Sequence, residues 1–562
     1  MEAAWDAETD FAVVGSGGGL VGALAARARG LDVLVLEKRA LVGGSTAMSG
    51  GVVWMPDNPL LARAGVPDSL EAGMAYFEAV VGNVGPASSP ERRHAFLTQG
   101  PAMIRFLQDL GIRFVHCDGY SDYYAEAKGG RARGRAIETL PFDARALGDW
   151  RSRLQPGFLA RSPVAIHTGE LAAFSLPYRS AHNLRTAARV VLRTAWLRLR
   201  GRRPLMNGAA LIGNLLARAL AQGIPVWTGT ALRDLVEEQG WITGVVAERE
   251  GRRLRIRARR GVLLAAGGFA HDAEMRRRCG GQQPNASEWT SANEGDTGEV
   301  LRAAMAHGAA TDLLDEAWWV QTSILPSGSK LMHISERTRP GAILVDASGR
   351  RYVNEAASYM EVGKAMYARD AQARAVPSWL VFDARFRRRY PWVVAPPAHT
   401  PREWIERGYM RRAASLRELA EQCGIDAAGL EATVERFNRF AREGRDPDFQ
   451  RGEGACDRVY GDPGQRPNPC LGPLDAPPYH AVAIYPGDVG TCGGVLCDEH
   501  SRVQREDGSA IEGLYATGNT TATVMGRSYL GPGASIAASM TFAYIAAQHA
   551  AAAGPGAAAG AR

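Results

Sequence analysis

Apolar runs and glycine turns alternate over the first forty residues of the chain. Residues 10–14 are a short apolar run, residues 20–29 are rich in alanine, and residues 32–36 are apolar again and end at Glu37. This order predicts a strand, a helix and a second buried strand. Glycines after the first strand let backbone N–H groups approach a pyrophosphate at the helix N-terminus, and Glu37 can accept a hydrogen bond from a ribose hydroxyl. The glycines are Gly15, Gly17, Gly18 and Gly19.

The glycine turn departs from the G-x-G-x-x-G consensus at its last position. Leu20 stands where the third glycine is expected, and Gly19 or Gly22 can substitute for it. Because the turn lies between a predicted strand and a predicted helix, it indicates a dinucleotide site rather than a glycine-rich surface loop. A second glycine turn, GGST at residues 43–46, follows the second strand.

Further along, the periodicity predicts a mixed α/β chain. Helical spacing predicts helices at 68–110, 296–307, 414–443 and 534–549, and a helix followed by a strand at 211–236. Apolar runs and turn residues predict hairpins at 244–258 and 341–355 and strands at 261–270 and 513–518. Residues 111–142 and 447–478 lack periodicity, so we expect irregular structure there.

Residues 184–200 predict a basic amphipathic helix. Arginines at 185, 189, 193 and 200 share one face with Trp196, and apolar positions occupy another. Two interpretations stay open: the helix packs its apolar face on the core, or that face lies in a membrane interface. The apolar positions are Leu184, Ala188, Val191, Leu192, Ala195 and Leu199.

Composition narrows the class of protein. The chain is 46% hydrophobic and 22% charged, which excludes wholesale disorder. Its length of 562 residues is too great for one compact core and predicts at least two domains. The net charge of +7 is partly local to the basic helix, and no recognition motif supports a nucleic-acid partner. Seven scattered cysteines predict reduced thiols and no metal site. We expect no signal peptide and no membrane-spanning helix, hence a cytoplasmic protein that could lie peripherally on the inner face of the cell membrane.

The chemistry predicted from these motifs is that of a flavoprotein. Only one glycine fingerprint is present, which indicates one dinucleotide site, whereas a flavoprotein oxidised by NADP would usually need a second. FAD is favoured because the N-terminal unit continues with GGST and is closed by a distant C-terminal strand, turn and helix. Near the C-terminus, Gly531, Pro532 and Gly533 precede the helix that begins at Ala534. The positive end of that helix can stabilise the anionic pyrimidine ring of a reduced flavin.

Motifs spread over most of the chain carry a family resemblance. They read VVGSGGG, GGSTAMSGGVVWMP, GYSDYY, SERTRPG, GRRYVNEAASY, GDVGTCGG and GLYATGNTTATVMGRSYLGPGAS. The chain resembles the 3-ketosteroid Δ1-dehydrogenases of the fumarate reductase and succinate dehydrogenase flavoprotein superfamily. The resemblance implies a Rossmann-like, glutathione-reductase-like FAD-binding domain with an inserted α+β catalytic domain. The expected divisions are 1–279 with an insert at 150–205, 280–465, 466–550 and a low-complexity tail at 551–562.

The resemblance also implies the site residues. Tyr529 and the backbone N–H of Gly533 would bind the ketone, Tyr359 would remove a proton from C2, and Tyr123 would support it while hydride leaves C1 for flavin N5. The implied FAD-binding residues are Gly15, Gly17, Gly18, Gly19, Glu37, Lys38, Gly44, Ser45, Thr46, Gly51, Ala266, Gly267, Gly518, Asn519, Ala534 and Ser535.

Elementary chemistry agrees with these roles. Removing a proton beside a ketone develops an enolate, and each of two donors on its oxygen contributes about 3 kcal/mol. Tyrosine is a weak base at an ordinary pKa near 10, so the hypothesis requires a hydrogen bond from Tyr123 and the flavin to lower the pKa of Tyr359.

Departures from the family pattern keep alternatives open. Leu530 replaces a common proline, and Gly531 stands where the 3-oxo-5α-steroid 4-dehydrogenases carry a serine. Tyr529 replaces the carboxylate-binding arginine of fumarate reductases, and Gly44 replaces a flavin-linking histidine, so we expect non-covalent FAD. The alternatives are a 4-dehydrogenase, a fumarate-reductase-like enzyme or a non-catalytic, membrane-associated FAD- and steroid-binding protein. The expected partners are a 3-ketosteroid and an external electron acceptor such as a quinone.

Overall fold

A computed structural model describes residues 4–160, 162–280, 286–393 and 395–553. Its largest sheet has eight strands in the order β20-β21-β10-β11-β1-β2-β8, with β9 paired to β10. The pairs of β1 with β2, β1 with β11, β2 with β8 and β11 with β21 are parallel. The strands are β1 (Ala7–Val14), β2 (Val33–Leu36), β8 (Val226–Trp227), β9 (Thr230–Glu238), β10 (Trp241–Arg249), β11 (Arg252–Leu264), β20 (Arg502–Gln504) and β21 (Ala510–Ala516).

The register of this sheet places the glycine turns side by side. Val14 lies opposite both Leu36 and Leu264, and Leu264 lies opposite Ala516. The carboxyl ends of four strands therefore share one edge, which is where open α/β sheets bind ligands. The predicted hairpin at 244–258 is confirmed, and its second arm is the same strand that continues to Leu264.

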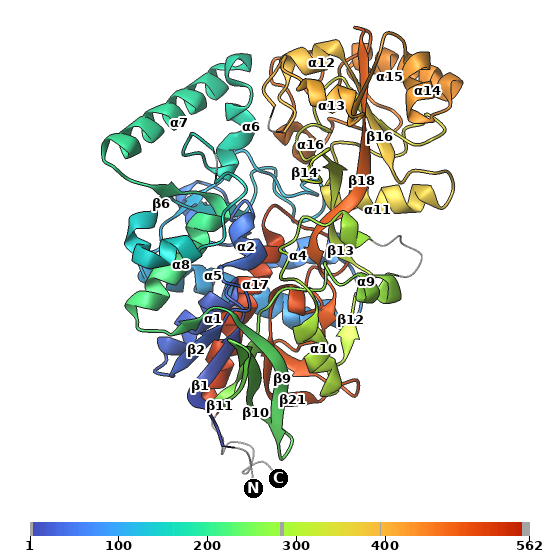
Figure 1. Cartoon of the computed structure of the whole chain (residues 1–562). Helices are drawn as coiled ribbons and strands as arrows, with labels where there is room; N and C mark the ends of the chain where they lie inside the picture. The colour runs from blue at the N-terminus through green and yellow to red at the C-terminus, as the bar shows by residue number, and fades with distance from the viewer. Residues whose placement is uncertain (1–3, 161, 281–285, 394, 554–562) are drawn as a thin grey trace.

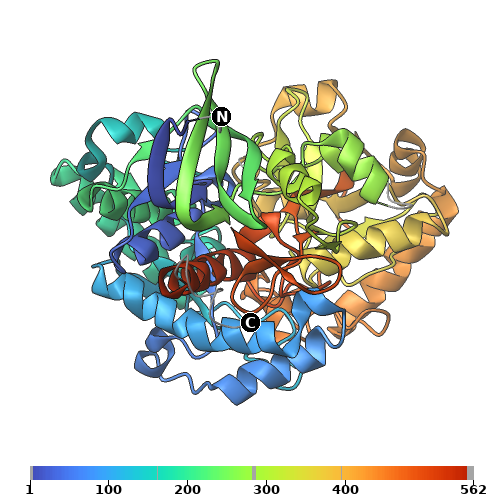
Figure 2. The ribbon, with the colours of Figure 1, turned by 90° about the horizontal axis from the view of Figure 1, so that it is seen from below.

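Helices cover the side of the sheet that carries the main core. Helix α17 packs between the sheet and α5, as Figure 2 shows from below, and α1 lies beside it. Gly22 permits this packing, because a Cβ there would lie 2.7 Å from Leu263 Cδ2 and 3.1 Å from the carbonyl oxygen of Ala543. It thus takes the role expected of the third consensus glycine. The helices of this domain are α1 (Gly19–Arg27), α2 (Gly44–Met48), α3 (Pro59–Arg63), α4 (Leu70–Val80), α5 (Pro90–Asp109), α8 (Asn207–Ala221), α9 (Ala273–Cys279), α10 (Glu299–Ala306) and α17 (Ala534–Ala552). Of these, α9 and α10 pack on the opposite face of the sheet, in a second core cluster.

A second, antiparallel sheet forms the upper domain in Figure 1. Its order is β14-β13-β18-β16-β15, with β17 also paired to β18. Because β18 belongs to it, we propose that the chain returns to the FAD-binding domain after Thr491 rather than at residue 466. Its elements are β13 (Ala317–Ile324), β14 (Lys330–Met332), β15 (Ala342–Val345), β16 (Ser378–Asp383), β17 (Met410–Ala413), β18 (Tyr479–Thr491), α11 (Tyr359–Asp370), α12 (Ala384–Arg389), α13 (Arg402–Glu406), α14 (Leu416–Cys423), α15 (Ala427–Glu443) and α16 (Ala455–Val459).

Two predictions on local structure are wrong. Residues 111–142 contain β4 (Phe114–His116) and β5 (Ala136–Thr139), which pair in a small sheet with β3 (Val52–Trp54). All four residues of β5 are buried, so no alternating pattern marks the strand. The hairpin at 341–355 has its turn, but β15 pairs with β16 instead of with a second arm. Two-stranded pairs elsewhere join β6 (Phe142–Asp143) to β7 (Pro204–Leu205) and β12 (Thr311–Asp312) to β19 (Gly494–Val495).

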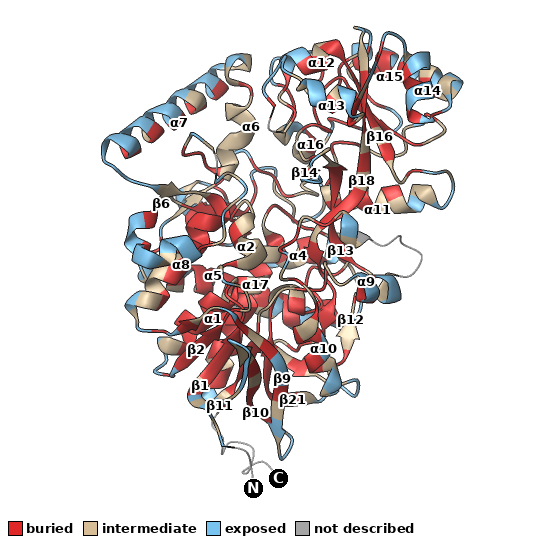
Figure 3. Cartoon of the chain, in the orientation of Figure 1, coloured by how far each residue is buried: buried red, intermediate tan, exposed pale blue. Residues whose placement is uncertain are grey.

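The predicted basic helix is α7 (Ala181–Leu199), which follows the short α6 (Leu171–Phe174). Its buried positions are Asn183, Thr186, Val190, Thr194 and Leu197. The predicted apolar face points outward instead: Leu192 is 69% exposed and Leu199 is 88% exposed. Figure 3 shows α7 as a largely exposed helix at the margin of the molecule. No described helix is long and apolar enough to cross a membrane. The predicted tail lies outside the described residues from 554 onward.

Candidate active site

The turn after β1 is a backbone cradle that only glycine can build. Gly15 has a φ of 107°, and a Cβ there would overlap the carbonyl group of Ala265. A Cβ at Gly18 would overlap the hydroxyl of Ser539 on α17. Because these glycines carry no side chains, an anion such as a pyrophosphate can approach the backbone at the N-terminus of α1.

Glu37 ties the two glycine turns together. Its carboxylate accepts a short hydrogen bond from the Ser16 hydroxyl and a 2.9 Å bond from the backbone N–H of Arg39. The Ser16 Oγ in turn accepts a 2.8 Å bond from the N–H of Gly43. Burial raises the pKa of Glu37 above its ordinary value. The contact of Glu37 with a ribose stays a prediction.

A buried acid that the sequence analysis missed completes this side of the cradle. Asp296 Oδ2 accepts a 3.2 Å bond from Ser45 Oγ, and a Cβ on Gly267 would overlap its carboxylate. Burial raises the pKa of Asp296 to about 7. Lys38 Nζ donates to Gly295 O at 2.6 Å and to Thr297 Oγ1 at 2.8 Å, so its side chain fixes the segment on both sides of Asp296. Asp296 escaped notice because the pattern there only indicated a helix.

The remaining predicted FAD-binding residues line the same edge. Thr520 Oγ1 donates to Gly267 O at 2.8 Å, and Asn519 Oδ1 accepts a 2.9 Å bond from Trp318 Nε1. The set brings glycine turns, a helix N-terminus and buried polar groups together, which fits a dinucleotide such as FAD. Its other members lie on α2 (Gly44, Ser45, Thr46), before β3 (Gly51), after β11 (Ala266), after β21 (Gly518) and at the start of α17 (Ala534, Ser535).

The three predicted tyrosines meet above this edge. Their ring centroids lie 5.6 Å apart for Tyr123 and Tyr359, 5.6 Å for Tyr123 and Tyr529, and 5.3 Å for Tyr359 and Tyr529. They come from the segment between β4 and β5, from the first turn of α11 and from the turn before α17. The structure therefore brings together residues more than 400 positions apart, although it does not test their roles.

Hydrogen bonds fix the segments that carry these rings. Leu530 O accepts a 3.0 Å bond from the N–H of Tyr123 and a 2.8 Å bond from the hydroxyl of Tyr76. The Tyr529 hydroxyl lies 3.2 Å from Ser535 Oγ, and the Trp318 ring centroid lies 4.9 Å from that of Tyr529. The segment that carries Tyr123 is thereby joined by a hydrogen bond to the segment that carries Tyr529, although the two lie far apart in sequence.

Gly533 stands where the chain enters α17. Its φ is 92°, and a Cβ would overlap the carbonyl group of Val52, so the position requires glycine. A Cβ on Gly531 would overlap the indole of Trp54, whose Nε1 donates to Asp122 Oδ1 at 2.8 Å. Burial raises the pKa of Asp122 to about 6, and Arg135, at 3.1 Å, opposes that effect.

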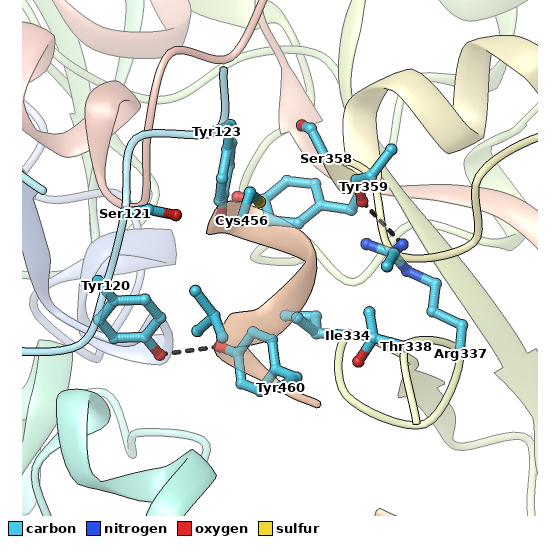
Figure 4. Close-up of a pocket in the computed structure, with 13 residues that line it drawn as sticks. Tyr120, Ser121, Tyr123, Ile334, Arg337, Thr338, Ser358, Tyr359, Cys456 and Tyr460 are labelled. Atoms are coloured by element: carbon cyan, nitrogen blue, oxygen red, sulfur yellow. Dashed lines mark hydrogen bonds between the residues drawn. The ribbon is translucent and has the colours of Figure 1, made fainter. Parts of the chain in front are cut away.

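A pocket opens beside Tyr123 and Tyr359, with Arg337 and Cys456 in its wall (Figure 4). Burial raises the pKa of Tyr359 well above its ordinary value, and Tyr123 and Tyr529 raise it further. Within the protein, Tyr123 therefore does the opposite of what we expected, because a second buried phenol disfavours the phenolate. The effect of the flavin on this pKa stays a prediction.

Comparisons with known proteins agree with the geometry. The family described as FAD binding domain matches residues 10–536. A "3-oxosteroid 1-dehydrogenase" of Mycobacterium tuberculosis is 43% identical over 96% of this chain and 98% of its own length. A "4-oxocyclohexanecarboxylate 2-dehydrogenase" of Sinomonas cyclohexanicum is 35% identical over 96% of this chain and 92% of its own length. The 3-ketosteroid Δ1-dehydrogenase of Sterolibacterium denitrificans, solved in complex with 1,4-androstadiene-3,17-dione, superposes with a TM-score of 0.90 at 36% identity, covering 97% of this chain and 99% of that chain.

Proposed function

This chain belongs to the FAD-binding 3-oxosteroid 1-dehydrogenase family, and on that premise we propose that it introduces a C1–C2 double bond into 3-ketosteroids. It is an FAD-dependent oxidoreductase. The observation that supports the proposal is the meeting of Tyr123, Tyr359 and Tyr529 beside the N-terminus of α17. Three phenols and a backbone N–H suit a neutral ketone better than a dicarboxylate.

FAD supplies the oxidant that accepts hydride from the steroid. The cradle around Gly15, Gly18 and Asp296 would hold it through backbone N–H groups and buried polar side chains. We propose that the attachment is non-covalent, since Gly44 provides no side chain for a link. A Cβ at Gly44 would meet no atom of the described chain within 4 Å, so nothing else fills that place.

Two donors are proposed to bind the steroid's C3 oxygen. The Tyr529 hydroxyl and the Gly533 N–H would donate to the ketone and bind more strongly as enolate charge develops. Such preorganised donors each lower the barrier by about 3 kcal/mol, because they need no rearrangement during the reaction. Ser535 Oγ, 3.2 Å from the Tyr529 hydroxyl, orients that group.

Tyr359 is proposed as the base at C2. It begins α11, and its own carbonyl oxygen accepts a 3.0 Å bond from Gln321 Nε2. Tyr123 lies beside it and would take part in moving the proton away. Since burial favours the neutral phenol of Tyr359, proton removal requires a positive charge or a bound cofactor nearby.

The deciding experiment is anaerobic reduction of the purified holoenzyme. Adding 4-androstene-3,17-dione should bleach the flavin, and product analysis should place the new double bond at C1–C2. Tyr359→Phe should retain FAD and lose most of the bleaching rate. A panel with 5α-androstane-3,17-dione, 4-oxocyclohexanecarboxylate and succinate separates the 4-dehydrogenase, the small-ring dehydrogenase and the fumarate-type alternatives. Bleaching by none of the 3-ketosteroids would contradict the proposal.

We also propose that α7 docks the enzyme on an anionic membrane, where steroids and quinones dissolve. The outward apolar positions lie beside exposed arginines, and Arg200 Cζ lies 4.1 Å from the ring centroid of Trp196. An apolar face flanked by arginines is typical of interfacial helices. The external acceptor would then be a quinone on the inner face of the cell membrane. All seven cysteines are free, which agrees with a reducing compartment.

Vesicle sedimentation tests this docking. We expect the enzyme to bind vesicles containing anionic lipid and to lose binding in Leu192→Glu, with steroid turnover in detergent unchanged. The matched control variant is Tyr178→Glu, because Tyr178 is also an exposed apolar residue but lies before α7. Equal binding of wild type and Leu192→Glu would refute the docking without touching the proposed reaction.

A further inference from the structure

The pocket beside Tyr123 and Tyr359 has a far end that the proposed reaction leaves unexplained. Figure 4 shows Tyr120 and Tyr460 on the side of the pocket opposite to Tyr123 and Tyr359. Tyr120 follows β4, and Tyr460 follows α16 of the upper domain, so residues of both domains form this end. We call Tyr120 and Tyr460 the tyrosine pair.

The walls between the two ends of the pocket are mostly apolar. The guanidinium of Arg337 lies in the wall, but it is engaged with the backbone, since it donates to His333 O at 3.1 Å and to Ala357 O at 2.8 Å. An apolar pocket that adjoins the proposed reaction centre suits the fused hydrocarbon rings of a steroid beyond the ring that reacts. The aliphatic side chains in the wall are those of Ile334, Ala356, Ala357 and Val459.

A hydrogen bond joins the tyrosine pair. The two hydroxyl oxygens lie 2.8 Å apart, as the dashed line in Figure 4 marks, and the ring centroids lie 6.2 Å apart in an edge-to-face arrangement. Tyr120 belongs to a small buried cluster with Val52, Cys117 and Ala136, and Tyr460 packs against that cluster. Two linked aromatic rings therefore occupy the far end of the pocket.

Both members of the tyrosine pair are held from behind. The Tyr120 hydroxyl also donates to Thr168 O at 3.2 Å. Asp462, two residues after Tyr460, forms an ion pair with Arg179 at 2.8 Å. Thr168 and Arg179 lie in the segment that leads into α7, so this segment supports the far end of the pocket from outside. The rings cannot move aside for a longer ligand without breaking these contacts.

We propose that the tyrosine pair is the specificity-determining end wall of the substrate pocket and limits the length of the steroid's C17 substituent. C17 lies at the opposite end of the fused ring system from C3, so it points to the far end of the pocket when the ketone ring lies beside Tyr359 and Tyr529. A ketone or hydroxyl at C17 fits in front of the wall, whereas a long alkyl chain meets the two rings. The inference rests on the proposed function, because it presumes that the ketone ring reacts beside these tyrosines.

A series of C17 substituents tests the end wall. The holoenzyme is assayed with 4-androstene-3,17-dione, progesterone and 4-cholesten-3-one, which carry a ketone, an acetyl group and a long branched alkyl chain at C17. With a dye as acceptor and a fixed detergent concentration, kcat/KM of the wild type should fall in that order. In Tyr460→Ala, kcat/KM for 4-cholesten-3-one relative to 4-androstene-3,17-dione should rise by about 10- to 200-fold, the discrimination that a hydrophobic pocket achieves for one methylene group.

Companion variants separate the bulk of the ring from other effects. Tyr460→Phe keeps the ring and should retain the wild-type preference. Tyr460→Leu shortens the side chain but keeps apolar contact, so it should relax the preference even where the alanine variant does not fold. The matched control is Tyr479→Ala, because Tyr479 is also a half-buried tyrosine of the upper domain but does not line the pocket. Flavin absorbance per chain shows that each variant is folded.

Two failures can be told apart. If none of the 3-ketosteroids bleaches the flavin of the wild type, the proposed function is wrong and the end wall is wrong with it. If 4-androstene-3,17-dione gives the C1–C2 product but the wild type accepts 4-cholesten-3-one equally well, the reaction stands and only the end wall is refuted. An unchanged ratio in the alanine and leucine variants of Tyr460, or an equal rise in Tyr460→Phe or Tyr479→Ala, would refute it as well.

Discussion

Replacing Tyr529 by phenylalanine removes one hydroxyl from the site and leaves the ring in place. The ring is 5% exposed and packs against Trp318, with centroids 4.9 Å apart, and against Tyr359 at 5.3 Å. These ring contacts remain in the variant, which loses the contacts of the hydroxyl with Ser535 Oγ, at 3.2 Å, and with the side chain of Tyr359. The substitution should therefore fold normally and bind FAD, and it isolates one donor of the proposed oxyanion site.

The expected loss follows from the charge that develops on the ketone. Removing one of two preorganised donors costs about 3 kcal/mol of transition-state stabilisation, or roughly a 150-fold loss in rate. Because the donor binds the enolate more tightly than the neutral ketone, kcat should fall by most of this factor and KM should change little. The Gly533 N–H remains, so activity should not vanish.

Single-turnover flavin reduction is the appropriate assay, since it separates the chemical step from steroid binding. Ser535→Ala serves as the companion variant: it removes only the group that orients the Tyr529 hydroxyl and should cost less than Tyr529→Phe. A fall of less than fivefold in Tyr529→Phe, or a loss confined to KM, would show that this hydroxyl does not stabilise the transition state.

Three further predictions concern the cofactor cradle and the buried acids. Gly15→Ala should yield protein with little bound FAD, measured as flavin absorbance per chain, because a Cβ there overlaps the carbonyl of Ala265 at a φ of 107°; a fully yellow variant would contradict the steric argument. Asp296→Asn should stabilise the apoprotein at pH 8 by up to about 4 kcal/mol and have no such effect near pH 4. The pKa of Asp296 is about 7 in the folded protein against an ordinary 3.8, so its ionised carboxylate destabilises the fold as pH rises. Denaturant unfolding at the two pH values checks this, and a pH-independent effect would refute it. Arg135→Met should destabilise the fold by about 3 to 5 kcal/mol, because it leaves the buried Asp122 without its ion-pair partner and Asp68 with only Arg131, at 3.7 Å. A smaller loss in urea unfolding would contradict this.

The parts of the fold that follow from local rules were predictable. The turn at Gly15 lies between a strand and a helix that adjoin in sequence, so its residues alone indicate the structure. Gly22 could be named as a substitute for the third consensus glycine, because either position can provide the missing side chain that close packing of the helix on the strand requires. The tyrosines required the family resemblance, since nothing local distinguishes Tyr359 from the other fifteen tyrosines of the chain.

The rest depended on tertiary structure. Every residue of β5 is buried, so period-two alternation could not reveal it. The direction of α7 could not be read either, because polar Asn183, Thr186 and Thr194 lie inward. The same limit hid Asp296 and Tyr460, whose importance arises from which residues surround them after folding and not from their neighbours in sequence.

The carbonyl of Leu530, which receives both the Tyr123 N–H and the Tyr76 hydroxyl, has a consequence for biosynthesis. During translation, the glycine turn at Gly15 leaves the ribosome some five hundred residues before the segment that anchors these tyrosines. Ser539, which lies against the same turn, emerges later still. We therefore expect nascent chains to acquire FAD only after release, so that a truncated product lacks a working redox centre and cannot leak electrons to oxygen.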